Sequence, residues 1–182
     1  MLAVSLFVGA CATPGGYSGV PGEGRAERLA VAGEHEDAAR VYFGLAAEAS
    51  LQERDRLTLL AVEQWLDAGD INRARSAFRG VTRPATAEAR YLWDTNSAAL
   101  ALYSGEADQA LDILESMSRQ SLPERHRLRV EALRADAWIQ KGDPARAVEL
   151  MTQREMWLSD RRSIERNRLR LWQGLLVSDP QQ

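Results

Sequence analysis

Residues 65–78 read WLDAGDINRARSAF, and the spacing of this segment occurs four times along the chain. In each copy a glycine is followed by an acidic residue, with an alanine five positions and a larger apolar residue nine positions after the glycine. The glycines, at spacings of 36, 36 and 37 residues, are Gly33, Gly69, Gly105 and Gly142. The positions five and nine residues later hold Ala38 and Tyr42, Ala74 and Phe78, Ala110 and Leu114, and Ala147 and Met151. The position four residues before each glycine holds Leu29, Trp65, Ala101 and Trp138. Four agreeing copies indicate a repeat protein.

Each repeated position has a physical role in a pair of helices. The glycine can adopt the left-handed conformation that ends a helix, and the acid suits the positive end of the next one. Asp143-Pro144 is a strong helix start, because proline is favoured at the first helical position. The alanine lets two helices approach closely, and the larger residue one turn later fills the space between them. The pattern therefore predicts helical hairpins.

The whole chain is expected to be all-α. Apolar residues recur at helical spacing, and no segment keeps the alternation with a period of two that is typical of a half-buried strand. Pro84 and Pro123 stand between hairpins, where a helix is expected to start again. The expected helices cover residues 24–32, 34–48, 51–68, 70–80, 84–104, 106–119, 123–141, 143–158 and 161–177.

The repeat resembles the tetratricopeptide repeat, in which a turn glycine is followed by alanine five residues later and by a large residue four further on. The resemblance covers about residues 25–158. The period of 36 to 37 residues is longer than the family's 34 or so. The resemblance to this repeat implies an α-solenoid of about four helical hairpins plus a C-terminal helix. This domain would cover residues 25–182 and have a concave face.

The first residues of the chain carry a targeting signal. Residues 2–10 are uncharged and mostly apolar, which is too short for a membrane span and suits a signal peptide. Val8-Gly9-Ala10-Cys11 resembles a bacterial lipobox, which implies that residues 1–11 are a lipoprotein signal with Cys11 as the lipidated residue. The residue after it, Ala12, implies sorting to the outer membrane, with the protein on its periplasmic side. Residues 12–24 are rich in glycine and proline and are expected to form a flexible linker. The alternative is a buried structural cysteine in an ordinary helix.

The chain also resembles the N-terminal domain of the penicillin-binding protein activators, the LpoA or LppC-type lipoproteins. The residues that carry this resemblance are Cys11, the segment 56–61 before the Gly69 turn, and the segment 167–175 with Asn167, Trp172 and Leu175. The resemblance implies an outer-membrane lipoprotein that activates a class A penicillin-binding protein, a peptidoglycan synthase. In that family an α/β module follows the helical domain, so the chain is expected to correspond to the N-terminal part alone.

Composition argues against several other classes of function. With 23 basic and 26 acidic residues, the net charge of −3 is unlike that of a nucleic-acid-binding protein. Cys11 is the sole cysteine, and no histidines and cysteines have metal-ligand spacing, so neither a metal nor a cofactor is expected. His35 and His126 are both expected at the surface, near the starts of helices. Without a nucleophile and base in a recognised arrangement, the protein is expected not to be an enzyme.

The candidate binding residues come from the repeat phase. The positions expected to face the concave groove are Arg56, Glu63, Thr95, Arg129 and Asp136. Basic clusters at 125–129 and 161–170 are expected to be solvated helix faces, with contact to an anionic glycan or acidic partner as the alternative. The five tryptophans are expected in the core, with an aromatic ligand pocket as the alternative, and Asn96 either bonds a neighbouring loop or lines the groove.

Together these features predict a scaffold or regulator of peptidoglycan synthesis. Its expected partners are a class A penicillin-binding protein, peptidoglycan as a second candidate, and the outer membrane through the lipid anchor. Two alternatives are a general tetratricopeptide-type lipoprotein adaptor in envelope assembly and a peptidoglycan-active enzyme.

Overall fold

The computed structural model describes residues 21–118, 122, 124–159 and 161–177, and over these residues it is helical with no strand. The prediction of an all-α fold is confirmed. In chain order, the helices in the described ranges are α1 (Glu23–Ala32), α2 (His35–Glu48), α3 (Leu51–Asp67), α4 (Ile71–Phe78), α5 (Ala87–Tyr103), α6 (Ala107–Ser118), α7 (Glu124–Gln140), α8 (Pro144–Glu155) and α9 (Arg161–Val177).

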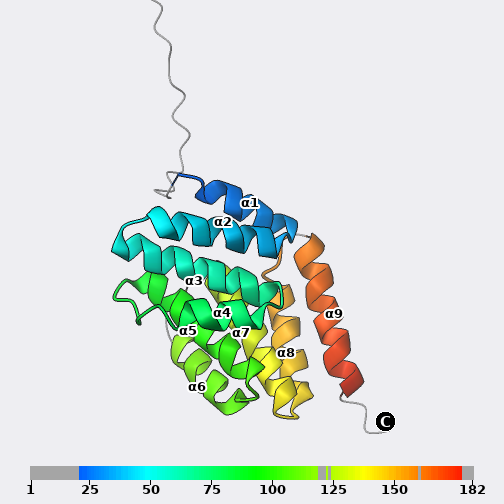
Figure 1. The fold of residues 1–182 in the computed structure, drawn as a ribbon. Helices are drawn as coiled ribbons and strands as arrows, with labels where there is room; N and C mark the ends of the chain where they lie inside the picture. The colour runs from blue at the N-terminus through cyan, green and yellow to red at the C-terminus, as the bar shows by residue number, and fades with distance from the viewer. Residues whose placement is uncertain (1–20, 119–121, 123, 160, 178–182) are drawn as a thin grey trace, which may run out of the picture.

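The helices form a stacked array of antiparallel pairs (Figure 1). α1 packs on α2, α3 on α4, α5 on α6 and α7 on α8, while α9 packs on α8. The first helices of successive pairs also contact one another, since α3 packs on α5 and α5 on α7. The arrangement is the predicted one of four hairpins followed by a C-terminal helix.

The first and last helices of the array meet. In Figure 1 the start of α9 lies close to the end of α1. There Arg162 Nη1 donates hydrogen bonds to the backbone oxygens of Val31 and Ala32, at 3.3 and 3.1 Å. A cation suits this position because a helix has a partial negative charge at its C-terminus.

The four turn glycines end the first helix of each hairpin in the same way. Their φ angles lie between 78° and 83°, in the left-handed region. In every turn the N–H after the glycine donates to the carbonyl four residues before the glycine, at 2.8 to 2.9 Å. This six-to-one bond is the Schellman motif, and it satisfies a carbonyl that the helix end leaves open. The repeat in the sequence is therefore a repeat of helix terminations.

Gly105→Ala is expected to lower the free energy of unfolding by about 1–2 kcal/mol, because an L residue is strained at a φ of 82°. No atom lies within 4 Å of the added Cβ, so backbone strain alone is tested. Gly44→Ala is the matched control: Gly44 lies inside α2, its added Cβ is equally free of contacts, and its φ is not positive. There alanine is expected to stabilise by about 0.5–1 kcal/mol. Urea denaturation of both variants checks this, and equal effects would contradict it.

The acids after the glycines begin the second helices, but they do not all act as caps. The Asp70 carboxylate accepts a bond from the Arg73 N–H at 3.1 Å, and the Asp143 carboxylate accepts one from the Arg146 N–H at 3.3 Å. Glu34 makes no side-chain cap bond at the start of α2. The shorter aspartate reaches the free N–H groups of the first turn, which agrees with its preference for N-cap positions.

The four repeated alanines are buried between the helices. Ala38, Ala74, Ala110 and Ala147 are almost inaccessible to solvent, as are Leu114 and Met151 among the larger residues four positions later. The core continues through three connected regions: the largest extends from α1 to α5, a second joins α5 to α7, and a third joins α7, α8 and α9. Each hairpin thus buries its apolar face against its neighbours, as in other repeat proteins.

Most helices begin within one residue of the predicted position, and α5 begins three residues later than predicted. α1 begins at Glu23, inside the stretch expected to be linker, because the buried Glu23 carboxylate forms an ion pair with Arg56 at 2.7 Å. α5 begins at Ala87, three residues after Pro84. Its N-cap, Thr86, has an extended backbone, and the Arg90 side chain donates to the Ala85 carbonyl oxygen at 2.6 Å. The residues directly after Pro84 are therefore fixed in a non-helical conformation before α5 begins.

The prediction that all five tryptophans are core is only partly correct. Trp65 is buried, while Trp93 and Trp138 are half-buried at the edges of the core. The prediction is wrong for Trp157 and Trp172, which lie on the surface near the last repeat. Arg127 stacks on the Trp157 ring, with its guanidinium carbon 4.3 Å from the ring centroid.

No helix in the described part of the chain has both the length and the apolar character needed to cross a bilayer. Cys11 and most of the expected linker lie outside the described residues.

Candidate functional site

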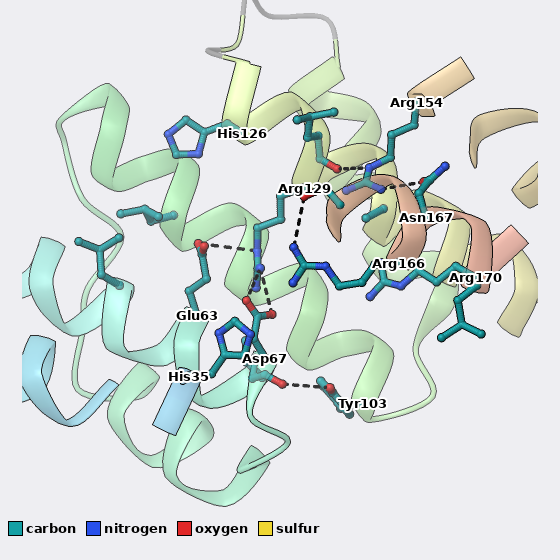
Figure 2. A pocket seen from close by; sticks show the side chains of 17 residues that line it. His35, Glu63, Asp67, Tyr103, His126, Arg129, Arg154, Arg166, Asn167 and Arg170 are labelled. Carbon is teal, nitrogen blue, oxygen red and sulfur yellow. Dashed lines mark hydrogen bonds and ion pairs between the residues drawn. The ribbon is translucent and has the colours of Figure 1, made fainter. Parts of the chain in front are cut away.

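A groove of about 580 Å³ lies along the first helices of the hairpins and is closed on one side by α9 (Figure 2). Most of its lining comes from α3, α5, α7 and α9, with one residue each from α2 and α8. We call this the inner groove. Its lining residues are His35, Leu60, Glu63, Leu66, Asp67, Leu92, Tyr103, His126, Leu128, Arg129, Ala132, Arg154, Ser163, Arg166, Asn167, Leu169 and Arg170.

Side chains from one hairpin bond the backbone of the hairpin before it. Tyr103 Oη donates to the Leu66 carbonyl at 3.3 Å, and Gln140 Nε2 donates to the Leu102 carbonyl at 3.1 Å. Donor and acceptor are 37 and 38 residues apart, which is one repeat. These carbonyls lie in the last turns of α3 and α5, and each also accepts a bond from the N–H of the turn glycine, at 3.1 and 3.0 Å. The bonds from Tyr103 and Gln140 help to hold the first helices in register along the groove.

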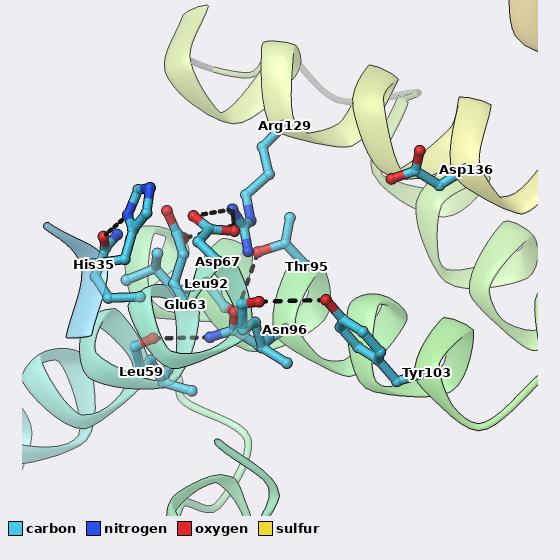
Figure 3. Close-up of polar contacts among 12 residues, drawn as sticks. His35, Leu59, Glu63, Asp67, Leu92, Thr95, Asn96, Tyr103, Arg129 and Asp136 are labelled. Carbon is cyan, nitrogen blue, oxygen red and sulfur yellow. Dashed lines mark hydrogen bonds and ion pairs between the residues drawn. The ribbon is translucent and has the colours of Figure 1, made fainter. Parts of the chain in front are cut away.

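Asn96 also joins two hairpins. It is fully buried in α5, and its Nδ2 donates to the Leu59 carbonyl of α3 at 2.9 Å (Figure 3). Of the two alternatives that the sequence left open, the hydrogen bond is correct, but its acceptor lies within helix α3 and not in a loop. A buried amide needs such a partner, because leaving a polar group without a hydrogen bond in the core is costly.

Arg129 crosses the groove from α7 to α3. Its Nη1 lies 3.1 Å from both carboxylate oxygens of Asp67, and its Nε lies 3.7 Å from Glu63 Oε2. Burial opposes the charge of the guanidinium, but the two carboxylates outweigh it and raise the pKa of Arg129 above its usual range. The bridge is therefore ionic and joins residues 62 positions apart in the chain.

Arg154 and Asn167 form a second polar cluster, where α7, α8 and α9 meet. Arg154 Nε donates to the Leu128 carbonyl at 3.0 Å, and its Nη1 donates to Asn167 Oδ1 at 2.7 Å. The buried Asn167 side chain donates in turn to the Met151 carbonyl at 2.9 Å. Asn167 thus uses its acceptor and its donor to attach α9 to α8.

The structure brings some of the predicted groove residues together and separates others. Glu63 and Arg129 line the inner groove and contact each other, as expected. Asp136 lines an adjoining hollow of about 280 Å³, 3.7 Å from Arg170, and burial raises its pKa while Arg170 acts in the opposite direction.

Thr95 and Arg56 do not face the inner groove as the repeat phase predicted. Thr95 is buried, and its hydroxyl donates to the Tyr91 carbonyl of its own helix at 2.8 Å. Arg56 lies outside the groove lining and is paired with Glu23 and Glu53. The repeat phase gives the wrong position for Arg56 because the side chain turns toward the buried carboxylate of Glu23 in α1. The hydrogen bond with Glu23 raises the pKa of Arg56.

The prediction that both histidines are surface residues is wrong for His126. It is 4 % exposed, and its ring lies against Tyr91 with centroids 5.5 Å apart. His35 is half-buried, with its Nδ1 2.9 Å from Gln64 Oε1. Both histidines line the inner groove although 91 positions separate them, and sequence spacing gave no sign of this.

The two basic clusters are not simply solvated faces. Arg161 does point to solvent and pairs with Glu165 at 2.8 Å. Arg129, Arg166 and Arg170 instead line the inner groove. Arg166 and Arg170 are four residues apart and therefore lie on the same face of α9. The groove therefore gathers arginines from both runs and from α8.

The inner groove is lined by both charged and apolar side chains. In the described part of the chain, no group of histidine, cysteine, aspartate and glutamate side chains has the arrangement of a metal site. Comparison of the chain with protein-family models, curated protein sequences and solved structures gives no match.

Proposed function

We propose that this protein is a scaffold that binds a partner protein through the inner groove, and that it acts as a regulator rather than as an enzyme. The feature that supports this is the groove itself, which is built from the first helices of several hairpins and exposes both charged and apolar groups. Helical arrays use such extended inner faces to hold segments of other proteins.

The bonding within the groove supports binding more than catalysis. Arg129 is held by two carboxylates, and Arg154 by a backbone carbonyl and an amide. Groups held in fixed positions are suited to recognition, since less side-chain entropy is lost when a partner binds.

We further propose that the partner is a class A penicillin-binding protein and that the protein acts from the outer membrane, anchored through Cys11. This proposal depends on the resemblance to the penicillin-binding protein activators and on the lipobox-like segment 8–11. A triacylated cysteine provides the several chains that long-lived anchoring requires.

Site-specific photo-cross-linking tests the groove and the partner together. A benzoyl-phenylalanine is placed at Leu169, which is exposed and lines the inner groove, and in a second variant at Arg79, which is exposed near the end of the short outer helix α4. Each variant is irradiated with a purified class A synthase, and the polymerisation of its lipid-linked substrate is measured with and without the protein. We expect a cross-link from position 169, none from position 79, and faster polymerisation.

Each of the other results has a distinct meaning. A cross-link from position 79 alone would show that the outer surface is the binding face and would refute the groove. Absence of both cross-links and of stimulation would refute the synthase as partner and favour the adaptor alternative. Clearing of a murein gel by the purified protein would refute the non-enzymatic function.

A further inference from the structure

Four arginines enter the inner groove, but only two of them have an acidic partner among the described residues. Arg129 pairs with Glu63 and Asp67, and Arg170 pairs with Asp136 at 3.7 Å.

The other two are held by neutral groups. Arg154 donates to a backbone carbonyl and to the Asn167 amide oxygen, while Arg166 Nη2 donates to the Ser163 hydroxyl at 3.2 Å. The α8–α9 side of the groove therefore carries two arginines that form no ion pair with a described carboxylate (Figure 2).

The positive charges in this cluster act on one another. The pKa of Arg154 is lowered, first by burial and then by the charges of Arg170 and Arg166. Asp136 and Glu131 oppose this with smaller effects. An anion that enters beside Arg154 would relieve this repulsion.

We propose that the α8–α9 side of the inner groove binds carboxylate side chains of an acidic, extended segment of the partner protein, with Arg154 and Arg166 as the principal contacts. This inference rests on the proposed partner-binding function and names the chemistry that the groove recognises.

The groove favours carboxylates over more highly charged anions. A planar guanidinium can match a carboxylate with two parallel hydrogen bonds. Within this groove Arg129 already binds a carboxylate, since its Nη1 donates to both oxygens of Asp67. Glu63 and Asp67 line the opposite side of the same groove, so a dianionic phosphate would meet more repulsion there than a single carboxylate.

The apolar lining favours a peptide over a free small anion. Of the leucines that line the groove, Leu169 is exposed and Leu128 is half-buried, while Leu60, Leu66 and Leu92 form a floor that is almost closed to solvent. An extended segment in which acidic and apolar residues alternate can place its carboxylates on the arginines and its apolar side chains on Leu128 and Leu169.

Fluorescence anisotropy with a labelled octapeptide of alternating Glu and Leu tests the proposal. The reference probe is the same peptide with Gln in place of Glu. The full chain is expected to bind the Glu peptide at least tenfold more tightly, and Arg166→Gln is expected to weaken that binding about tenfold. Raising the salt from about 50 to 500 mM is expected to weaken it as well, because exposed charges are screened.

The matched control is Arg161→Gln, which removes an arginine from the same helix whose side chain is 92 % exposed and paired with Glu165. It is expected to leave binding unchanged. Leu169→Glu is a second test variant: it places a negative charge in the groove at an exposed position and is expected to weaken binding even if Arg166→Gln alters the helix.

Equal binding of the Glu and Gln peptides, or equal effects of Arg166→Gln and Arg161→Gln, would overturn the proposal. So would displacement of the peptide by inorganic phosphate at the peptide's own concentration, which would identify a phosphate site. If the Glu peptide fails to bind while the synthase still cross-links at position 169, the carboxylate proposal is wrong and the scaffold function stands. If the peptide binds and the synthase does not, the partner is wrong and the carboxylate site stands.

Discussion

Replacing Leu114 by alanine is expected to lower the free energy of unfolding by about 2–5 kcal/mol, the largest stability effect that we expect from a single substitution in this chain. Leu114 lies in α6, its side chain is 0 % exposed, and it packs in the apolar cluster that joins α5 to α7. The substitution removes its apolar contacts and leaves a cavity that the neighbouring helices close only in part. Because this cluster connects the second half of the array to the first, the loss of stability is expected to affect the unfolding of the whole array and not of one hairpin alone.

Urea denaturation followed by circular dichroism measures this effect. Leu51→Ala is the matched control, since Leu51 lies at the start of α3 with its side chain 77 % exposed. It is expected to change the unfolding free energy by less than about 0.5 kcal/mol. A loss at Leu114 no greater than that at Leu51 would mean that α6 does not pack as described.

Asn167→Ala is expected to lower the free energy of unfolding by about 2–3 kcal/mol. The substitution removes the bond from Arg154 Nη1 and the bond to the Met151 carbonyl, both at a position closed to solvent. The guanidinium keeps only its bond to the Leu128 carbonyl. Hydrogen bonds to charged groups contribute more to stability than bonds between neutral groups. The loss of stability at Asn167 is therefore expected to exceed the loss at a buried amide that bonds only neutral groups.

The effect is expected to be greatest in α9, because Asn167 attaches that helix to α8. Amide hydrogen exchange, together with urea denaturation, distinguishes local unfolding of α9 from a loss of stability throughout the array. Asn72→Ala, at an exposed position in α4, is the control and is expected to be neutral within about 0.5 kcal/mol. If exchange in α9 is unchanged in Asn167→Ala, the polar cluster does not hold the helix in place.

Much of the fold was predictable because its signals are local. A glycine at the left-handed position and an acid after it act within one turn of the chain, and the alanine five residues later lies on a helix whose face follows from its period. Most helix bounds agree with the prediction within one residue, and the largest differences are at the start of α5 and the end of α8. At the start of α1 a non-local contact contributes. Glu23 is drawn into α1 by Arg56, which lies 33 residues further along the chain.

The site was less predictable because its partners come from different repeats. Repeat phase placed Glu63 and Arg129 in the groove, and the structure agrees. It gave no indication that Arg129 reaches Asp67, that His126 is buried, or that Arg154 meets Asn167. A repeat signal describes what the copies share, whereas these contacts depend on residues that differ between copies.

The amino-acid sequence by itself determined the helical class, the number of hairpins and the positions of their turns, since each depends on the conformational preferences of a few neighbouring residues. The tertiary structure alone decided which side chains meet in the inner groove. The stacking angle of the hairpins and the docking of α9 bring together residues from distant repeats, and those distances follow from packing over the whole array.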